Sequence, residues 1–437
     1  MDLGTISLII LFGLIGLILI GIPLGFASGF LGALIVLIKI GPSGMGILLA
    51  RMYSLVITYS FLSVPLFIFM ACLLERSNIA RDLYDSLNAW LKKTRGGVAV
   101  VTAIMATIMA AMSGIIGGEI VLLGLIALPQ MLRLKYNQDL AIGVVCASGS
   151  LGTMIPPSVV LIIYGLVTAS SITVLFQEAI VPGLMISGLI IAYILIRTRL
   201  QPSLAPIDEN EPALTVKEKL KYLPGFIPPV ILVAVVLGSI YAGITGITEA
   251  AGMGCVFTII IIYFRKELSW FLLKDAITRT FKSTGTIITI TFGATVLAGA
   301  YSLIGGPTYV AGSILGLDVS PMVVILIMML IFLVLGAFMD WTGIVLLSMP
   351  VFLPIVIKLG FDPIWFGILF CINMQVSFLS PPFGPAAFYL KSVTPPHITL
   401  TDIFRSFGPF IVIQVIVLLL VLFFPELTQN FHEFKKR

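Results

Sequence analysis

The sequence predicts an all-α polytopic membrane protein, with about ten transmembrane helices and two re-entrant helical hairpins arranged in two inverted repeats. Three observations lead to this fold class. The 437-residue chain is 59% hydrophobic and only 10% charged, with a mean hydropathy of +1.16, whereas a soluble domain is roughly 25% charged. Two long apolar stretches are broken near their middle by small and polar residues. A proline pattern recurs in the second half of the chain at a constant offset.

Apolar runs of about 20 residues, the length that a helix needs to cross a bilayer, set the predicted spans. The first run is expected to be a retained span and not a signal peptide, because no basic residue precedes Lys39. The predicted spans are residues 5–21, 23–40, 55–74, 139–165, 180–196, 225–241, 247–264, 283–303, 364–390 and 407–424.

Two further apolar stretches, 98–131 and 320–356, are too long for one span and too short for two. Small and polar residues interrupt both, among them Ser113 and Glu119 in the first and Asp340 in the second. A helix that enters halfway, turns and returns to its own side fits this length. Because an irregular tip at membrane depth needs protein or water around its backbone, both hairpins are expected to line a cavity.

The basic residues predict the orientation in the membrane. With the N-terminus outside and both hairpins returning to their own side, 19 of the 25 Lys and Arg residues fall in inner loops. Treating either hairpin as a single span removes this bias, and the basic tail at 435–437 is the feature that opposes it. Within the inner segments, 81–95 and 266–282 mix Trp, Leu and basic residues as helices in the membrane interface do.

The two halves carry related sequences. The tetrapeptide IVLL precedes a proline in each half, and these prolines, Pro129 and Pro354, are 225 positions apart. Pro156 and Pro381, each the first of a Pro-Pro pair, are also 225 positions apart. The expected division is residues 1–199 for the first repeat, 200–224 for a cytoplasmic linker and 225–437 for the second, inverted repeat.

The Pro-Pro pairs are expected to unwind the spans 139–165 and 364–390, because proline lacks an N–H and clashes with the preceding turn. Inverted repeats with helices broken near mid-membrane place a ligand site at their interface. Freed carbonyls and neutral polar side chains suit a monovalent cation such as Na⁺, and inward helix N-termini suit an anion. The polar side chains are Ser148, Ser150, Thr153 and Ser158 in the first half and Asn373, Gln375, Ser377 and Ser380 in the second.

Other functional classes lack their motifs. The chain has no GxSxG or HExxH of an intramembrane enzyme, and no Gly-Lys dipeptide that a P-loop for ATP hydrolysis would need. Four isolated cysteines and two histidines form no metal-binding pattern, and no basic and aromatic cluster indicates nucleic-acid binding. We therefore expect no catalysis and no cofactor. A channel is disfavoured because the repeats indicate alternating access.

Five pieces of the sequence carry a family resemblance: SGIIGGEIVLLGLIALP, GSLGTMIPPSVVLIIYG, GITGITEAAGMG, FMDWTGIVLLSMPVFLP and FLSPPFGPAAFYLK. In these pieces the sequence resembles the large membrane subunit of tripartite ATP-independent periplasmic (TRAP) transporters, the DctM-type family. The resemblance runs in order through both halves and covers essentially the whole chain. It implies an elevator-type secondary transporter in a bacterial inner membrane that imports a small organic acid, such as a C4-dicarboxylate, sialic acid or keto acid, coupled to Na⁺.

The resemblance also implies partners and sites. The partners are a periplasmic solute-binding protein and a small four-helix membrane subunit, expected as a separate chain because no four-span extension precedes or follows the predicted spans. Carried over by position, one Na⁺ site is expected at Ser113, Gly114, Gly149, Ser150, Gly152 and Thr153, and a second at Asp340, Thr342, Gly343, Asn373, Gln375 and Ser377. The solute is expected between the hairpin tips, near Pro156, Ser158, Ser380 and Pro382.

Several assignments stay open. The first tip has isoleucine and glycine after Ser113 where family members often have hydroxyls, so side-chain ligands for the first cation are fewer. Glu119 is a proton carrier, a cation ligand or a cap of the returning helix, and Asp340 is a ligand, a solute gate or an N-cap. A stand-alone Na⁺- or H⁺-coupled di- or tricarboxylate symporter with the same hairpin architecture is the alternative function.

Overall fold

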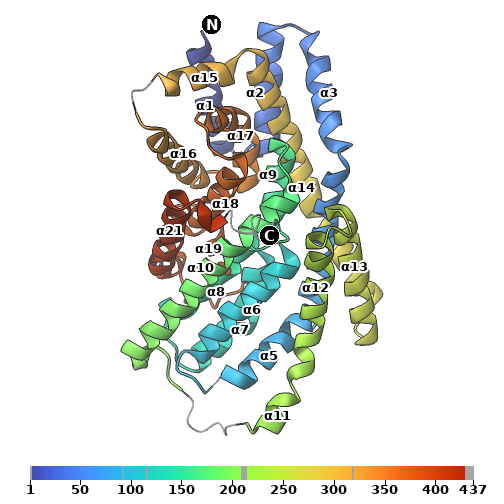
Figure 1. Ribbon diagram of the computed structural model, residues 1–437, viewed down its shortest axis with the longest axis vertical. Coiled ribbons are helices and arrows are strands. Elements are labelled where there is room, and N and C mark those ends of the chain that lie inside the picture. Colours follow the sequence, from blue (N-terminus) through green and yellow to red (C-terminus); the bar gives the residue numbers. More distant parts are fainter. Residues whose placement is uncertain (1, 92, 115–116, 208–213, 317–318, 429–437) are drawn as a thin grey trace.

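The structure, a computed structural model, describes residues 2–428 except 92, 115–116, 208–213 and 317–318. This described part of the chain consists of helices and connecting turns, without a strand. The helices α1 to α3 lie at one end of the long axis, and α5 and α11 lie at the opposite end (Figure 1). All-α architecture is therefore as the sequence predicts.

The helices α2, α3 and α12 to α14 lie along one side of the molecule (Figure 1), and α1 packs against α2. α2 packs along α14, and α4 packs against both α13 and α14. The seam between α2 and α14 is close, because a Cβ on Gly32 would lie only 2.7 Å from the backbone of Leu297. The bounds are α1 Leu3–Leu19, α2 Leu24–Lys39, α3 Gly44–Val56, η1 Tyr59–Leu62, α4 Ser63–Arg76, α12 Ile227–Tyr241, α13 Ile247–Phe264 and α14 Trp270–Leu303.

Both segments that the sequence predicts as hairpins are pairs of helices that pack on each other. The first pair is α6 (Gly97–Ser113) and α7 (Gly118–Arg133), and the second is α16 (Pro321–Gly336) and α17 (Trp341–Lys358). The second tip is defined by Asp340, whose carboxylate accepts from the Thr342 N–H at 3.2 Å as the N-cap of α17.

The Pro-Pro segments interrupt helices in both halves, as the sequence predicts. In the first half, α8 (Gln138–Gly149) and α9 (Val159–Thr168) are separated by an irregular stretch that contains the 3₁₀ turn η2 (Leu151–Thr153). In the second half, α18 (Pro363–Leu379) ends before the prolines and α19 (Pro385–Lys391) begins after them. Both Pro-Pro peptide bonds are cis.

The remaining helices surround the broken ones or belong to the connecting segments. α10 and α21 pack against α18, and α20 packs against α8. The amphipathic helix α5 packs on α6 and on the end of the linker, η4. The bounds are α5 Ile79–Leu91, α10 Ile172–Leu200, η3 Pro202–Leu204, α11 Val216–Leu220, η4 Leu223–Phe226, α15 Gly306–Leu315, α20 Leu400–Ser406 and α21 Gly408–Phe423.

The helix boundaries repeat the offset seen in the prolines. Asn137 caps α8 and Asp362 caps α18, at positions 225 apart. α7 ends at Arg133 and α17 at Lys358, again 225 apart, and the ends of α2 and α13 have the same spacing. The local sequence signals of the two halves therefore produce corresponding helices.

The count of about ten spans is not confirmed. Six helices are long and apolar enough to cross a membrane, or seven if the bent pair of α20 and α21 is one span. α1 has 17 residues and α2 has 16, fewer than the roughly 20 of a full span. Each broken span is divided between two helices, of 12 and 10 residues in the first half and of 17 and 7 residues in the second. The described helices nevertheless make this a multi-pass membrane protein.

Candidate functional site between the hairpin tips

The tip of the first hairpin lies directly against the first break. The N–H of Val159, at the start of α9, donates to the carbonyl of Gly114 at 3.2 Å. Gly114 has a φ of +61°, and a Cβ there would overlap the carbonyl of Pro157. Backbone groups of the described residues thus bring the tip and the break into direct contact.

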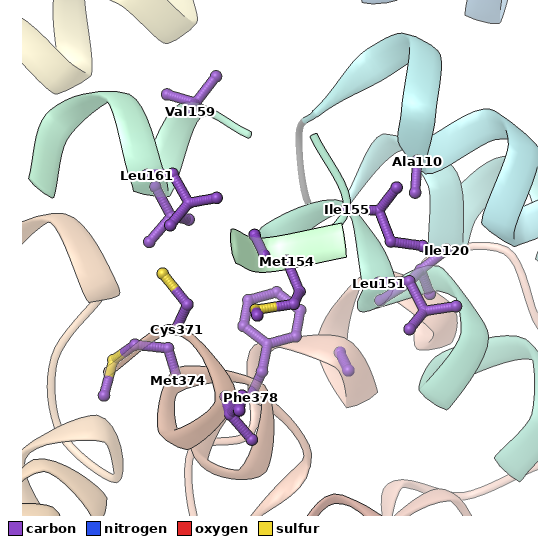
Figure 2. Close-up of a cluster of buried hydrophobic side chains, with 14 of the residues drawn as sticks. Ala110, Ile120, Leu151, Met154, Ile155, Val159, Leu161, Cys371, Met374 and Phe378 are labelled. Atoms are coloured by element: carbon purple, nitrogen blue, oxygen red, sulfur yellow. The ribbon is translucent and has the colours of Figure 1, made fainter. Parts of the chain in front are cut away.

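The two breaks meet through apolar side chains. Figure 2 shows Met154 of the first break next to Phe378 of α18, on the side where Cys371 and Met374 lie, whereas Ile155 lies beside Ala110 and Ile120 of the first hairpin. All seven residues are buried. Cys371, like the other three cysteines of the chain, is a buried free thiol. The centre between the halves is therefore a packed apolar contact, and polar groups lie at its edge.

A cavity of about 440 Å³ lies at this edge, between the two hairpin tips. Gly114 of the first tip and Asp340 of the second both line it. α14 contributes two hydroxyl-bearing residues, and Thr342 of α17 and Tyr389 of α19 contribute one each. The described lining residues are Ile68, Gly114, Val159, Val160, Ser283, Thr286, Ile287, Ile290, Asp340, Trp341, Thr342, Phe378, Phe383, Pro385 and Tyr389.

The cavity has one acidic residue, Asp340, and no Lys or Arg among its described lining residues. The Asp340 side chain is exposed there even though one oxygen accepts from the Thr342 N–H. Of the roles considered for Asp340 the structure shows the N-cap, and its position at the cavity leaves the ligand and gate roles as predictions. A carboxylate entering this cavity would be repelled by Asp340 unless a cation were bound nearby.

A second cavity, of about 360 Å³, lies between α1, α14 and the second hairpin. Ser7, Tyr301 and Ser348 are its polar lining residues, and Ser7 and Tyr301 hydrogen-bond each other at 2.7 Å. The remaining described lining is aliphatic, aromatic or methionine. Because it offers no charge and little free hydrogen bonding, this cavity is a poor candidate for a polar solute.

The residues expected around the first cation are buried together at the first break. Ser150 donates to the Ala147 carbonyl at 2.8 Å, and Thr153 donates to the Ser150 carbonyl at 2.9 Å. Both hydroxyl protons are therefore used, and the oxygen lone pairs remain for a cation. Ser113 ends α6, Gly114 is at the tip, Gly149 ends α8, Ser150 follows it, and Gly152 and Thr153 lie in η2.

The residues expected around the second cation fall into two places. Asp340 and Thr342 lie at the cavity, and Gly343 follows them in α17, against Leu24. Asn373 and Ser377 lie one turn apart on α18, facing α16, where Asn373 Nδ2 donates to the Met329 carbonyl at 2.6 Å.

Several polar atoms in this part of α18 have no partner among the described residues: Asn373 Oδ1, Ser377 Oγ and both amide atoms of Gln375. Burial without a partner costs free energy, so these atoms suit a bound ion or water. Gln375, however, is two positions from Asn373 and from Ser377 and points from another face of the helix. One common ligand set for all six expected residues is not evident in this arrangement.

The four residues expected near the solute lie beside the cavity, and none is among its described lining residues. Ser158 donates to the Thr153 carbonyl at 2.5 Å and caps α9, and Ser380 donates to the Val376 carbonyl at 2.7 Å. Pro156 and Pro382 form the irregular turns. Their neighbours Val159 and Phe383 line the cavity instead.

Gln414 of α21 is a polar residue at this site that the sequence analysis missed. It is fully buried, its Nε2 donates to Ser150 Oγ at 3.3 Å, and its Oε1 has no partner among the described residues. The available signal was a lone glutamine within the apolar run IVIQVIV. An amide at such a depth is costly unless it bonds to something.

The described part of the chain, with its two hairpins, two broken helices and a cavity between the tips in which Asp340 and hydroxyl groups lie among apolar side chains, has the construction of a secondary transporter. Residues 11–427 match the family described as "Tripartite ATP-independent periplasmic transporter, DctM component". The chain belongs to this family, whose named relatives are permease subunits and not enzymes.

Similar proteins include the C4-dicarboxylate TRAP transporter large permease protein DctM of Pseudomonas aeruginosa, 29% identical, with 92% of each chain covered. The sialic acid TRAP transporter large permease protein SiaM of Vibrio cholerae is 28% identical, with 96% of each chain covered. The Alcanivorax borkumensis YdaH transporter, known from a crystal structure, has a similar fold, with a TM-score of 0.61 and 89% of each chain covered. Its sequence is 17% identical to this chain. That likeness shows a transporter fold.

Proposed function

We propose that the protein is the large transmembrane subunit of a binding-protein-dependent secondary transporter, which imports a small organic acid together with Na⁺. It acts in a bacterial inner membrane with a small four-helix membrane subunit and a periplasmic solute-binding protein. The solute is a C4-dicarboxylate, a sialic acid, a keto acid or a similar carboxylate. C4-dicarboxylate and sialic acid are the solutes in the names of two relatives.

The composition of the cavity carries the proposal of cation coupling. It lies between two hairpin tips and contains Asp340 without a basic lining residue in the described part. An anionic solute gains access only if positive charge enters with it or precedes it. Na⁺ on the oxygen-rich breaks supplies that charge, and the inward N-terminus of α17 adds to it. The buried oxygens of Ser150 in the first expected site, and of Asn373 and Ser377 in the second, support Na⁺ as the coupling ion.

The elevator mechanism is supported by the internal repeat. The 225-residue offset in prolines and helix boundaries supports inverted repeats at 1–199 and 225–437 with the linker 200–224. In the proposed motion, α6 to α10 and α16 to α21 move as one body and carry the cavity past α1 to α4 and α12 to α14.

Uptake into proteoliposomes tests the proposal. Vesicles contain this chain and its small partner, and solute uptake is measured under an inward Na⁺ gradient with and without the binding protein. Candidate carboxylates are first selected by the thermal shift that they cause in that binding protein. Uptake is expected only with Na⁺ and the binding protein together, and uptake driven equally well by K⁺ would contradict the proposal.

The same experiment separates the alternative, a stand-alone symporter. Uptake by this chain without the small subunit and the binding protein would establish that alternative. Membership in the DctM family favours the three-component system.

A further inference from the structure

A third cavity, of about 200 Å³, lies where the start of α8, the end of α10 and the junction of α20 with α21 meet. Close packing fixes its walls. A Cβ on Gly143 of α8 would overlap the Phe410 ring and lie 2.7 Å from the Ser406 carbonyl oxygen. The rings of Phe410 and Tyr193 meet edge to face, with their centroids 5.3 Å apart. The cavity is therefore built between helices of both halves of the chain.

Three charged side chains line this cavity: Asp139 in the first turn of α8, Arg197 in the last turn of α10 and Arg405 in the last turn of α20. Among the described residues, none of the three forms an ion pair or a side-chain hydrogen bond. Arg405 also acts on Asp402, whose carboxylate is already held by the hydroxyl and N–H of Thr399. Charges of both signs thus line one cavity without pairing with each other.

Two neutral donors accompany the arginines. Tyr193 and Asn137 also line the cavity, and in the described part of the chain neither the Tyr193 hydroxyl nor Asn137 Nδ2 has a hydrogen-bond partner. Asn137 Oδ1 is used, because it accepts from the Leu140 N–H at 3.0 Å as the cap of α8. Guanidinium groups form paired, charge-assisted hydrogen bonds with phosphate oxygens, and the start of a helix favours the same charge. The donors therefore suit a phosphate, whereas Asp139 suits a cation.

The cavity lies at the ends of spans that the basic residues place on the inner side of the membrane. Its lining residues lie within or next to the predicted inner loops 132–138, 197–224 and 391–406. The structure brings these three loops, which are far apart in the sequence, to one place. At this depth the cavity is level with the head groups of the inner leaflet, and basic pockets between membrane helices on this side bind lipid head groups.

An exposed apolar stripe runs from the cavity along α21. Pro409 lines the cavity, and Val412, Ile416, Leu419 and Phe423 follow it on the same face of the helix, all of them exposed. From Val412 to Phe423 the stripe is about 16 Å long, at 1.5 Å per residue, or about half of the hydrocarbon core. α21 lies at the edge of the molecule (Figure 1). The stripe is therefore placed to contact one acyl chain of a lipid whose head group occupies the cavity.

We propose that this cavity binds the head group of phosphatidylethanolamine from the inner leaflet. Arg197 and Arg405 hold the phosphodiester, and Asp139 accepts hydrogen bonds from the ammonium group. Each charge of the cavity then has a partner of opposite sign. An anionic lipid without an amine, such as phosphatidylglycerol, would leave the Asp139 carboxylate beside a second negative group. The lipid joins α8 and α10 of the first half to α20 and α21 of the second.

Thermal unfolding of this chain in complex with its small subunit, in a non-ionic detergent, tests the site without any transport. The ligands are dihexanoyl phosphatidylethanolamine, dihexanoyl phosphatidylglycerol and glycerophosphoethanolamine, which has the head group but no acyl chains. We expect the largest rise in Tm with phosphatidylethanolamine, because a ligand of the native state stabilises it. Arg197→Gln should raise the lipid concentration for half of this rise about tenfold or more. Arg199→Gln is the control, because Arg199 is exposed on α10 and does not line the cavity.

Asp139→Asn should remove the preference for phosphatidylethanolamine over phosphatidylglycerol, and Asp139→Glu should keep it. A response of Arg197→Gln equal to wild type would overturn the proposal, and Arg405→Gln decides the matter if Arg197→Gln does not fold. A wild-type preference for phosphatidylglycerol would also overturn it. An equal response to glycerophosphoethanolamine would make the ligand a soluble phosphate ester and not a lipid. A lipid response of this chain alone that the complex lacks would assign the surface to the small subunit instead.

Discussion

The glycines of the first hairpin tip are explained by what approaches them. Gly114 meets the Pro157 carbonyl, Gly117 meets the Tyr389 ring, and Gly118 meets the Glu75 carboxylate. Gly114 and Gly117 also have positive φ values of 61° and 101°. Seen from the sequence, the glycines appear as missing hydroxyl ligands. In the structure, the lack of side chains on these glycines lets three other segments reach the backbone of the tip. Packing therefore requires glycine at these positions.

Gly114→Ala should therefore damage the protein more than a glycine change elsewhere. A left-handed alanine costs roughly 1–3 kcal/mol, and its methyl group also collides with backbone that cannot move aside. Gly188→Ala is the matched control, because Gly188 is exposed in the middle of α10 and a Cβ there meets nothing within 4 Å. We expect a lowered Tm and lost uptake for Gly114→Ala only. Equal Tm values for the two variants would contradict the tip geometry.

Ser150→Ala and Asn373→Ala should raise the Na⁺ concentration needed for half-maximal uptake. Removing one polar ligand forfeits about 1–1.5 kcal/mol, up to roughly a tenfold shift in apparent affinity. The measurement is Na⁺-dependent uptake at saturating solute, with Tm as a check on folding. Ser392→Ala is the control, since Ser392 is exposed beyond α19. Unchanged Na⁺ activation in either test variant would remove that residue from the cation site.

At the level of single residues, the sequence predicted only those positions that neighbouring residues in the chain determine. Ser150 and Thr153 could be placed at a break because Pro156 is close in sequence. The bond from Gln414 to Ser150 joins residues 264 positions apart, and no local pattern encodes it. For the same reason the separation of Asn373 from Asp340 became visible only once α16 and α18 were packed together.

At the scale of elements, prolines and caps gave better predictions than hydropathy. The hairpins and broken helices lie where tip residues and Pro-Pro pairs indicated. Most of the segment 266–282, expected as an interfacial helix, is instead continuous with the following span, because the 34-residue α14 begins at Trp270. No residue there interrupts the helical hydrogen bonds, so the helix continues although its surface changes from polar to apolar. α3 and α15 were not predicted, because each is short and only moderately apolar.

Two aspartates on α5 should respond to substitution in opposite directions. Asp82 forms an ion pair with Arg265, which follows α13. Burial, and then the like charge of Asp82, raise the pKa of Asp85, against the effect of Arg81. Asp82→Asn should lower stability by about 0.2–1 kcal/mol, the range for partly exposed pairs. Asp85→Asn should leave it unchanged or slightly higher at pH 7, because it removes an unfavourable charge.

The pH dependence distinguishes these two effects. A carboxyl whose folded pKa is raised favours folding most when protonated, and that contribution is lost as the pH rises through the folded value. The advantage of Asp85→Asn over wild type should therefore shrink on acidification and vanish below about pH 3.9, the ordinary pKa of aspartate. Tm measured by intrinsic fluorescence from pH 7 downward tests this. An advantage that grows on acidification would contradict the sign.

At the scale of the whole molecule, the contact between α2 and the second hairpin tests the elevator motion. A Cβ on Gly343 of α17 would overlap the Leu24 side chain at the start of α2. In the proposed motion these residues belong to different bodies and must separate in each cycle. Leu24→Cys with Gly343→Cys should therefore give a protein whose uptake stops when Hg²⁺ bridges the thiols and returns with dithiothreitol. The background lacks the native cysteines, Cys72, Cys146, Cys255 and Cys371.

A matched pair within one body shows whether bridging itself is harmful. Thr107 of α6 and Ser187 of α10 have hydroxyl oxygens 2.6 Å apart, close enough for cysteines there to bridge. Both helices belong to the body proposed to move, so a bridge between them should leave uptake intact. If Hg²⁺ bridged the cysteines at positions 24 and 343 completely and uptake were unchanged, the second hairpin would not separate from α2 during transport. The cavity would then have to open by motion of the tips alone, and the elevator proposal would fail while the coupling of solute to Na⁺ could still hold.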